Sequence, residues 1–283
     1  MTPFGVRLRA AMTDLGPLCV GIDPHDELLD AWGLPRSVDG VRAFAATCVE
    51  AFAGVAAVVK PQSAFFERYG AAGVAVLEDT LAGLREAGTL SILDAKRGDI
   101  GTTMSAYAQA FLGEESVGRA DALTVSPYLG YGSLRPALDL AGQTGRGLFV
   151  LALTSNPEGP SVQHARTDSG SVAGSIVAGV TASNAAARAR GELGSIGMVV
   201  GATVESGVAD LSLDLLAANA PLLAPGLGAQ GATAEDVRRV FGTALPNVLA
   251  SSSREVLQAG PSVAALRAAT LRHADALRQI TSG

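Results

Sequence analysis

Short apolar runs alternate with longer segments of helical periodicity along almost the whole chain. A short run bounded by turn residues is typical of a strand buried on both faces, and apolar positions three or four apart indicate a helix. The runs predict strands at residues 18–22, 55–59, 90–93, 122–125, 148–153, 196–200, 222–224 and 248–250. The periodic segments predict helices at residues 4–15, 41–52, 73–86, 103–112, 134–141, 175–190, 211–218 and 263–280. Strand and helix therefore alternate along the chain.

Eight strands, seven of them followed by a predicted helix, predict an α/β fold, a single (β/α)8 TIM barrel with an extra N-terminal helix in front of its first strand. Such a barrel takes about 250 residues, and no linker or change of composition divides residues 1–283, so we expect one domain. A dinucleotide-binding sheet would carry its glycine-rich turn after the first strand. Here that turn, residues 225–231, follows the seventh strand, where barrels that bind phosphate place the site.

Charged and polar residues stand where the predicted strands end. Asp94 and Lys96 are two positions apart, so their side chains should project from the same side of the strand. Gly98 interrupts the strand, and Asp99 lies in a loop with the composition of a helix cap. By itself, Asp-x-Lys-x-x-Asp is more often a surface ion pair followed by a helix cap. Other strand ends, however, also carry polar or charged residues: Asp23, Lys60, Ser126, Gln230 and Arg254.

The carboxyl ends of barrel strands meet at one mouth, so carboxylates and ammonium groups should gather there. Opposite neighbours keep such charges ionised, and the array could stabilise a carbanion without a cofactor. Two of the residues have plainer interpretations, Lys60 as a lysine reaching from a strand end to water and Arg254 as a helix-start arginine paired with Glu255 or Asp236. The histidines are too scattered for a catalytic triad, no His-Cys cluster suits zinc, and His25 is interpreted as structural. We therefore expect neither metal nor cofactor.

Composition and net charge limit the classes of binding partner and the cellular compartment that we expect. A net charge of -6 and a pI near 5.1 argue against a general nucleic-acid binder, whose surface would carry a basic stripe. No apolar run is long enough to span a membrane. Cys19 and Cys48 lack metal spacing and are expected to be reduced thiols of the core. We therefore expect a soluble cytoplasmic protein, in which residues 154–171, rich in Ser, Gly, Pro and Asn, form a lid.

Residues 94–101, Asp-Ala-Lys-Arg-Gly-Asp-Ile-Gly, resemble the signature of the orotidine 5'-phosphate decarboxylase family. Further segments match that family in order at the expected strand ends: 21–23, 59–61, 125–127, 225–231 and 253–254. Residues 23–25 and 154–157 are similar to the branch of the family found in mycobacteria and their relatives. The match covers essentially the whole barrel. It departs from the commoner branch in the long connection after Asp23 and in Ser253, where a glycine is more usual.

The resemblance implies an enzyme that converts orotidine 5'-phosphate to UMP, the last step of de novo pyrimidine nucleotide synthesis, without a cofactor or metal. Lys96 would donate the proton to C6 of the pyrimidine, and Asp94 would lie next to the departing carboxylate. Lys60 would bridge Asp94 and the ribose. The implied catalytic residues are Lys60, Asp94, Lys96 and Asp99.

The resemblance also implies how the substrate is held. Asp23 would bind the ribose 3'-hydroxyl, and Ser126 would contact the pyrimidine edge. The residues expected at the 5'-phosphate are Gln230 and Arg254, with Gly231 and Ser253 as neighbouring substrate-binding residues. Three residues would reach into the site of a second subunit, which makes the expected functional unit a homodimer: Asp99, Ile100 and Thr103.

Two alternatives remain open at this point. A metal-dependent sugar-phosphate decarboxylase or aldolase of the same barrel superfamily also has Asp-x-Lys-x-x-Asp, but holds its metal with an acidic residue where Lys60 stands. A lysine at that position would expel a cation. A non-catalytic sensor of phosphate ligands would have no need for alternating Asp and Lys, whose mutual placement costs stability unless it is used.

Overall fold

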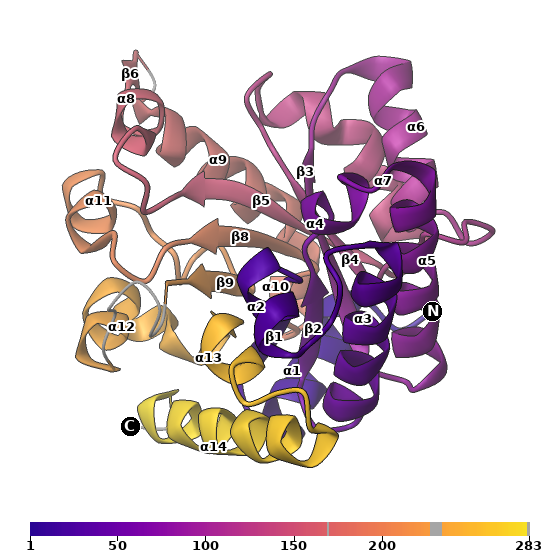
Figure 1. Ribbon diagram of the computed structural model, residues 1–283. Coiled ribbons are helices and arrows are strands. Elements are labelled where there is room, and N and C mark those ends of the chain that lie inside the picture. Colours follow the sequence, from indigo (N-terminus) through magenta and orange to yellow (C-terminus); the bar gives the residue numbers. More distant parts are fainter. Residues whose placement is uncertain (169, 227–233, 282–283) are drawn as a thin grey trace.

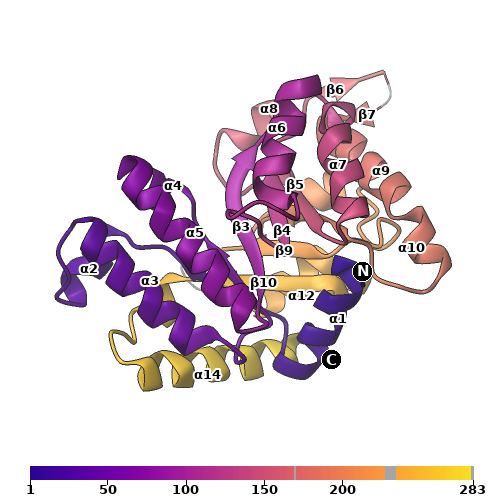
Figure 2. The ribbon, with the colours of Figure 1, turned by 90° about the vertical axis from the view of Figure 1, so that its right-hand side faces the viewer.

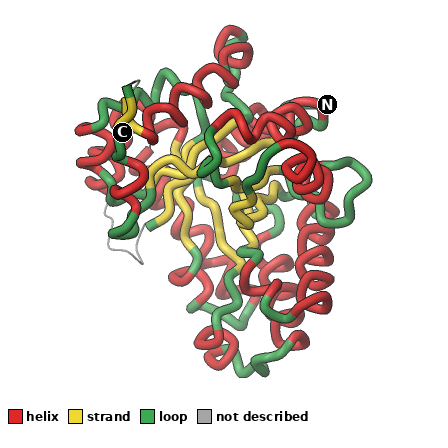
Figure 3. The backbone as a smooth tube through the Cα atoms, turned by 90° about the horizontal axis from the view of Figure 1, so that it is seen from above, coloured by secondary structure: helices red, strands yellow, loops and turns green. Residues whose placement is uncertain are grey.

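The structure is a computed structural model that describes residues 1–168, 170–226 and 234–281. Eight parallel strands close into a barrel in the order β1-β10-β9-β8-β5-β4-β3-β2, and helices surround it (Figures 1 and 3). The strands are β1 (Leu18–Ile22), β2 (Val58–Pro61), β3 (Leu90–Arg97), β4 (Ala122–Val125), β5 (Gly147–Leu153), β8 (Ile196–Val200), β9 (Leu222–Pro225) and β10 (Val248–Ser252). The predicted (β/α)8 TIM barrel is confirmed.

The helices follow the strands in sequence and pack on the outside of the barrel, where α3, α5 and α14 lie side by side (Figures 1 and 2). The first half of the chain carries α1 (Phe4–Leu15), α2 (Asp26–Ala31), α3 (Val38–Phe52), α4 (Ala64–Glu67), α5 (Gly70–Glu86), α6 (Gly101–Leu112), the 3-10 helix η1 (Tyr131–Leu134) and α7 (Arg135–Gln143). The second half carries α8 (Gly159–Gln163), α9 (Val172–Ser183), α10 (Ala185–Ala189), α11 (Glu205–Asp210), α12 (Ala234–Phe241), the 3-10 helix η2 (Gly242–Asn247), α13 (Arg254–Leu257) and α14 (Val263–Thr281). None of the helices described is both long and apolar enough to cross a membrane.

The predicted extra helix, α1, closes the amino-terminal end of the barrel. Phe4, Leu8 and Met12 share one buried face of α1 and pack among inward-facing strand residues. The rings of Phe4 and Phe149 meet edge to face, with centroids 6.0 Å apart. Gly147 permits this approach, because a Cβ there would lie 2.4 Å from Phe4 Cδ1. The carboxyl ends of the strands, at the opposite end, are left to form a site.

Several predicted elements differ from the structure. The predicted helix 175–190 is divided into α9 and α10. The run 55–59 begins too early, because the turn at Gly54 (φ 68°) occupies its start and β2 runs from Val58 through Lys60 to Pro61. The predicted helix 211–218 is wrong, because the helix after β8 is α11, which ends at Asp210. Ser212 has a φ of 54°, which a right-handed helix excludes, so the chain continues in turns.

The predicted lid, residues 154–171, contains α8 and the short antiparallel strands β6 (Arg166–Thr167) and β7 (Gly170–Ser171). The Thr154 N–H donates to Gln163 Oε1 at 2.9 Å, and Gln163 Nε2 donates to Thr154 Oγ1 at 2.7 Å. These bonds tie α8 back to the end of β5. The role of residues 154–171 as a lid stays a prediction.

Candidate active site

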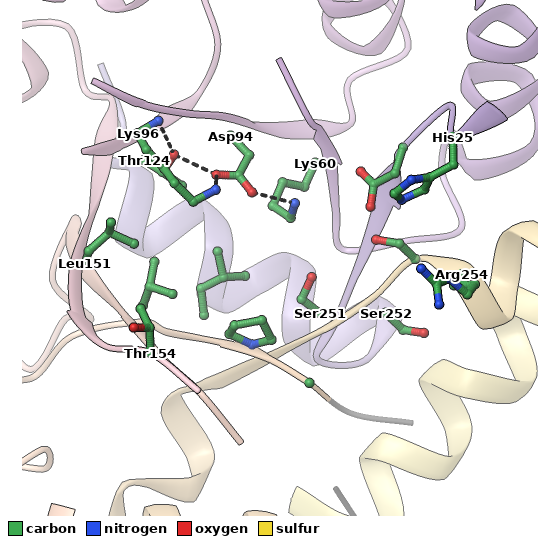
Figure 4. A pocket seen from close by; sticks show the side chains of 16 residues that line it. His25, Lys60, Asp94, Lys96, Thr124, Leu151, Thr154, Ser251, Ser252 and Arg254 are labelled. Carbon is green, nitrogen blue, oxygen red and sulfur yellow. Dashed lines mark hydrogen bonds and ion pairs between the residues drawn. The ribbon is translucent and has the colours of Figure 1, made fainter. Parts of the chain in front are cut away.

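The open end of the barrel holds a cavity of about 370 Å³. The end of every strand, or a residue just after it, contributes to the cavity wall. Lys96, Asp94 and Thr124 lie at one end of the cavity, and His25 and Arg254 lie at the other (Figure 4). The cavity therefore occupies the mouth that the strand-end residues predicted.

The carboxylate of Asp94 lies between two ammonium groups. Lys60 Nζ is 2.8 Å from Asp94 Oδ2, and Lys96 Nζ is 2.6 Å from Asp94 Oδ1. The side chains of Lys60 and Asp94 are only 8% and 10% exposed, whereas that of Lys96 is 45% exposed. Lys60 therefore does not reach out to water, and the plainer interpretation of this residue is wrong. The exposed lysine is the one with room to meet a ligand.

The surroundings of Lys60 and Asp94 favour the charged form of both side chains. Burial alone would raise the pKa of Asp94, but the charges and hydrogen bonds of Lys60 and Lys96 outweigh it and hold that pKa well below its usual range. Burial alone would lower the pKa of Lys60, but Asp94 and Asp23 raise it above its usual value. The site therefore carries fixed charges of both signs at neutral pH.

The far end of the cavity contains polar atoms without partners. Asp23 Oδ1 and Ser252 Oγ are buried there, and no described residue hydrogen-bonds either atom. Ser253 packs against Gly21, where a Cβ would lie 1.9 Å from the Ser253 hydroxyl oxygen, so β1 needs glycine at this point. Arg254 begins α13 and lines the same wall. This end offers an acceptor, hydroxyl groups and a guanidinium to a polar ligand.

The plainer interpretation of Arg254 finds no support in the described part of the chain, where Arg254 has no ion pair with Glu255 or Asp236. Glu255 instead lies 3.8 Å from Nδ1 of His273. The ring of His25 lines the cavity and packs against Phe65, with centroids 4.2 Å apart. Gln230, predicted at the phosphate, and Gly231, predicted as a neighbouring substrate-binding residue, lie outside the described residues.

Four predicted site residues do not line the cavity. Asp99 accepts a hydrogen bond from the N–H of Ile100 at 2.8 Å, and Ile100 is 61% exposed. Thr103 is exposed on α6. Ser126 directly follows β4, and its N–H donates to the carbonyl of Arg97 at the end of β3 at 2.8 Å; it is not part of the cavity wall. The roles expected of these four residues therefore stay predictions.

Sequence reasoning missed two threonines that line the cavity, Thr124 on β4 and Thr154 after β5. A signal for Thr124 was present, because it is the one polar residue in the apolar run 122–125 and stands close to its carboxyl end. Thr154 directly follows the last apolar residue of β5, the position at which Asp23 follows β1. The sequence analysis named the hydroxyl residues Ser126 and Ser253 at strand ends but overlooked these two threonines.

Comparison with known proteins places the chain in a family. The family model described as "Orotidine 5'-phosphate decarboxylase / HUMPS family" matches residues 16–269. The chain belongs to this family. The matched span contains every residue of the cavity wall that has been named, so the decarboxylase / HUMPS family assignment covers the whole site.

Individual relatives are similar over nearly their full length. An orotidine 5'-phosphate decarboxylase of Streptomyces coelicolor is 59% identical over 279 residues, which cover 98% of each chain. One of Salinispora arenicola is 58% identical and covers 96% of each. A crystal structure of a Streptomyces avermitilis protein, provisionally named orotidine 5'-phosphate decarboxylase, aligns with a TM-score of 0.94 and 56% identity over 100% of this chain and 97% of that one. The resemblance seen in residues 94–101 is confirmed.

Proposed function

We propose that the protein decarboxylates orotidine 5'-phosphate to UMP without a cofactor. The observation that carries this proposal is the Asp94 carboxylate held between Lys60 and Lys96 at the mouth of the cavity. The relatives that are more than half identical to the chain bear the name of this enzyme. The match of the family model over residues 16–269 supports one decarboxylase domain.

The reaction needs a fixed positive charge at C6 of the pyrimidine. Loss of CO2 leaves an electron pair in the plane of the ring, which the ring carbonyl groups cannot delocalise through the π system. An ammonium group held at C6 can stabilise this charge and then deliver a proton to it. We assign this role to Lys96, whose side chain is half exposed to the cavity while Asp94 holds its Nζ at 2.6 Å. Asp94 would lie beside the departing carboxylate.

The remaining cavity residues suit the ribose phosphate. Asp23 would accept a hydrogen bond from the ribose 3'-hydroxyl through Oδ1, to which no described residue donates, and Lys60 would reach the ribose from its ion pair with Asp94. Arg254 would bind the 5'-phosphate as a bidentate donor, with Ser253 beside it. We propose a phosphate contact for Gln230 as well, with Gly231 as a neighbouring substrate-binding residue. For the pyrimidine edge we keep Ser126 and add Thr154, because Thr154 lines the cavity.

We further propose that two copies of the chain form a homodimer in which each completes the other's site. Asp99, Ile100 and Thr103 lie outside their own cavity and exposed or half exposed, as residues that serve a neighbour would. Large apolar side chains lie exposed in the same part of the chain: Ile100 at 61%, Tyr128 at 80% and Leu129 at 54%. Burial of such side chains against a second copy would stabilise the dimer. Asp99 would then extend the partner's row of charges.

The metal-dependent alternative fits the site less well. A cation bound by Asp94 would have to displace the Lys60 ammonium, which lies 2.8 Å from Oδ2 and is buried with it. A cytoplasmic location suits the proposed pathway and the two free buried cysteines, Cys19 and Cys48.

The test is the loss of the orotate absorbance when purified protein acts on orotidine 5'-phosphate in the presence of EDTA. UMP should form, as identified by chromatography and mass, at a rate that EDTA does not change. The Lys96→Ala protein, purified in the same way, controls for decarboxylase carried over from the expression host. Turnover that requires an added divalent cation would overturn the proposal in favour of the metal-dependent enzymes.

A further inference from the structure

The hydroxyl of Thr124 joins two strands beneath the charged residues. Thr124 is 1% exposed on β4, and its Oγ1 accepts hydrogen bonds from the N–H groups of Ala95 and Lys96, both at 3.0 Å. The same hydroxyl donates to Asp94 Oδ1 at 2.9 Å. Figure 4 shows Thr124 beside both Asp94 and Lys96. One side chain therefore contacts the backbone and the carboxylate of β3 at once.

The backbone of β3 is irregular at this point. The register between β3 and β4 shifts between Leu93 and Arg97, and Lys96 has a φ of 48°, a conformation that residues other than glycine rarely adopt. Amide groups displaced from a regular ladder need another acceptor when they are screened from water. Thr124 Oγ1 supplies that acceptor to two successive amides. The left-handed conformation of Lys96 is therefore held from the neighbouring strand.

The direction of the hydroxyl proton follows from these bonds. Since Oγ1 accepts from two amides, its one proton is free to point only at Asp94 Oδ1. Oδ1 also accepts from Lys96 Nζ, and Oδ2 accepts from Lys60. Three donors from three strands thus fix the rotation of the carboxylate.

We infer that Thr124 is a positioning residue that sets where Lys96 Nζ points. It holds the lysine at both ends, at the backbone through two amides and at the ammonium group through Asp94. The inference rests on the proposed function, because it gives Lys96 a position that matters for proton delivery. Thr124 itself takes no part in proton transfer.

The test compares Thr124→Val, which keeps the shape and removes the hydroxyl, with Thr124→Ser, which keeps the hydroxyl. Thr270→Val is the matched control, because Thr270 is fully buried on α14 and its hydroxyl donates to the Leu266 carbonyl within that helix. Thr124→Val should lower kcat by about 100-fold, the loss typical of a misplaced catalytic group, and change the Kd for UMP by less than about threefold. Thr124→Ser should retain at least about a tenth of wild-type kcat, and Thr270→Val should match the wild type.

A second measurement does not depend on turnover. Hydrogen exchange of the Ala95 and Lys96 amides, followed by NMR, should be faster in Thr124→Val than in the unaltered protein and in Thr124→Ser. If Thr124→Val does not fold, Thr124→Ala replaces it in both comparisons. The inference is overturned if the valine protein keeps more than about a third of kcat, if serine is as slow as valine, or if amide exchange is unchanged. An unaltered protein that fails to decarboxylate orotidine 5'-phosphate contradicts the proposed function alone, and amide exchange then decides the role of Thr124.

Discussion

Replacing Lys60 by methionine should destabilise the fold, because the buried Asp94 carboxylate then loses the more deeply buried of its two lysine partners. Lys60 Nζ lies 2.8 Å from Asp94 Oδ2, and both side chains are about nine-tenths buried. Removing one member of a buried ion pair costs about 3–5 kcal/mol. Lys96 and Thr124 still donate to the other carboxylate oxygen, so we expect the lower end of that range, about 3 kcal/mol.

Urea denaturation followed by tryptophan fluorescence measures this loss. The chain has one tryptophan, Trp32, which is 7% exposed and stacks on Phe44 with ring centroids 4.1 Å apart. All proteins are compared at one concentration, because a dimer would make the unfolding midpoint depend on it. The double variant Lys60→Met/Asp94→Asn should recover at least half of the lost stability, since it buries no unpaired charge.

The effect of pH follows from the pKa of Asp94. In the wild type its folded pKa lies below the unfolded value, so its contribution to stability is present above about pH 4 and is lost as the pH falls through the folded pKa. Without Lys60 that pKa rises, the folded variant takes up a proton sooner, and its deficit relative to the wild type should shrink on acidification. A deficit below about 1 kcal/mol at pH 7, or a double variant as unstable as the single one, would refute the reasoning.

Three further predictions concern turnover. Lys96→Ala should lower kcat by at least about 10⁴-fold while UMP binding and circular dichroism persist, and a variant with a tenth of wild-type turnover would remove Lys96 as proton donor. Inactive Asp99→Ala and Lys96→Ala proteins, mixed in equal amounts, should regain about a quarter of wild-type activity after subunit exchange, because half of the dimers are then mixed and each mixed dimer has one intact site of two. If mass measurement verifies exchange and no activity returns, Asp99 serves its own chain. Arg254→Ala should lower kcat/KM at least about 10³-fold for orotidine 5'-phosphate and less than about threefold for orotidine, whereas equal losses would move the phosphate contact elsewhere.

The strands were predictable where a run of buried residues has clear borders. Leu18–Ile22 and Ile196–Val200 are buried at every position and end at polar or glycine residues, so the sequence marks both of their limits. The apolar run from Val55 does not show where β2 begins, because the turn at Gly54 keeps the first apolar residues out of the strand. The helix expected at 211–218 failed for a related reason. Leu215 is buried in the core, and Leu211 and Leu213 pack against it, all three from outside any helix. Apolar content indicates burial more reliably than it indicates conformation.

The charged residues of the site were predictable from strand periodicity. The contacts that hold those residues in place were not. Asp94 and Lys96 do meet, as two residues on one side of a strand should, yet Lys96 has a left-handed backbone that no regular strand contains. Thr124 belongs to a different strand, and its contact with Lys96 depends on the register of β4 against β3, where Leu123 lies opposite Leu93. A single sequence without that register cannot pair the two residues.

The geometry of Lys96 matters because the proposed reaction moves a negative charge by only about one bond length, from the substrate carboxylate to C6. The total charge at that end of the cavity is the same before and after CO2 leaves. Positive charge that stabilises the substrate carboxylate and the carbanion equally therefore does not raise the rate. Catalysis depends on an ammonium group placed closer to C6 than to the carboxylate. Asp94 and Thr124 are the contacts that hold Lys96 in one place. A substitution that loosens Lys96 without removing a charge should therefore harm catalysis more than its effect on net charge would suggest.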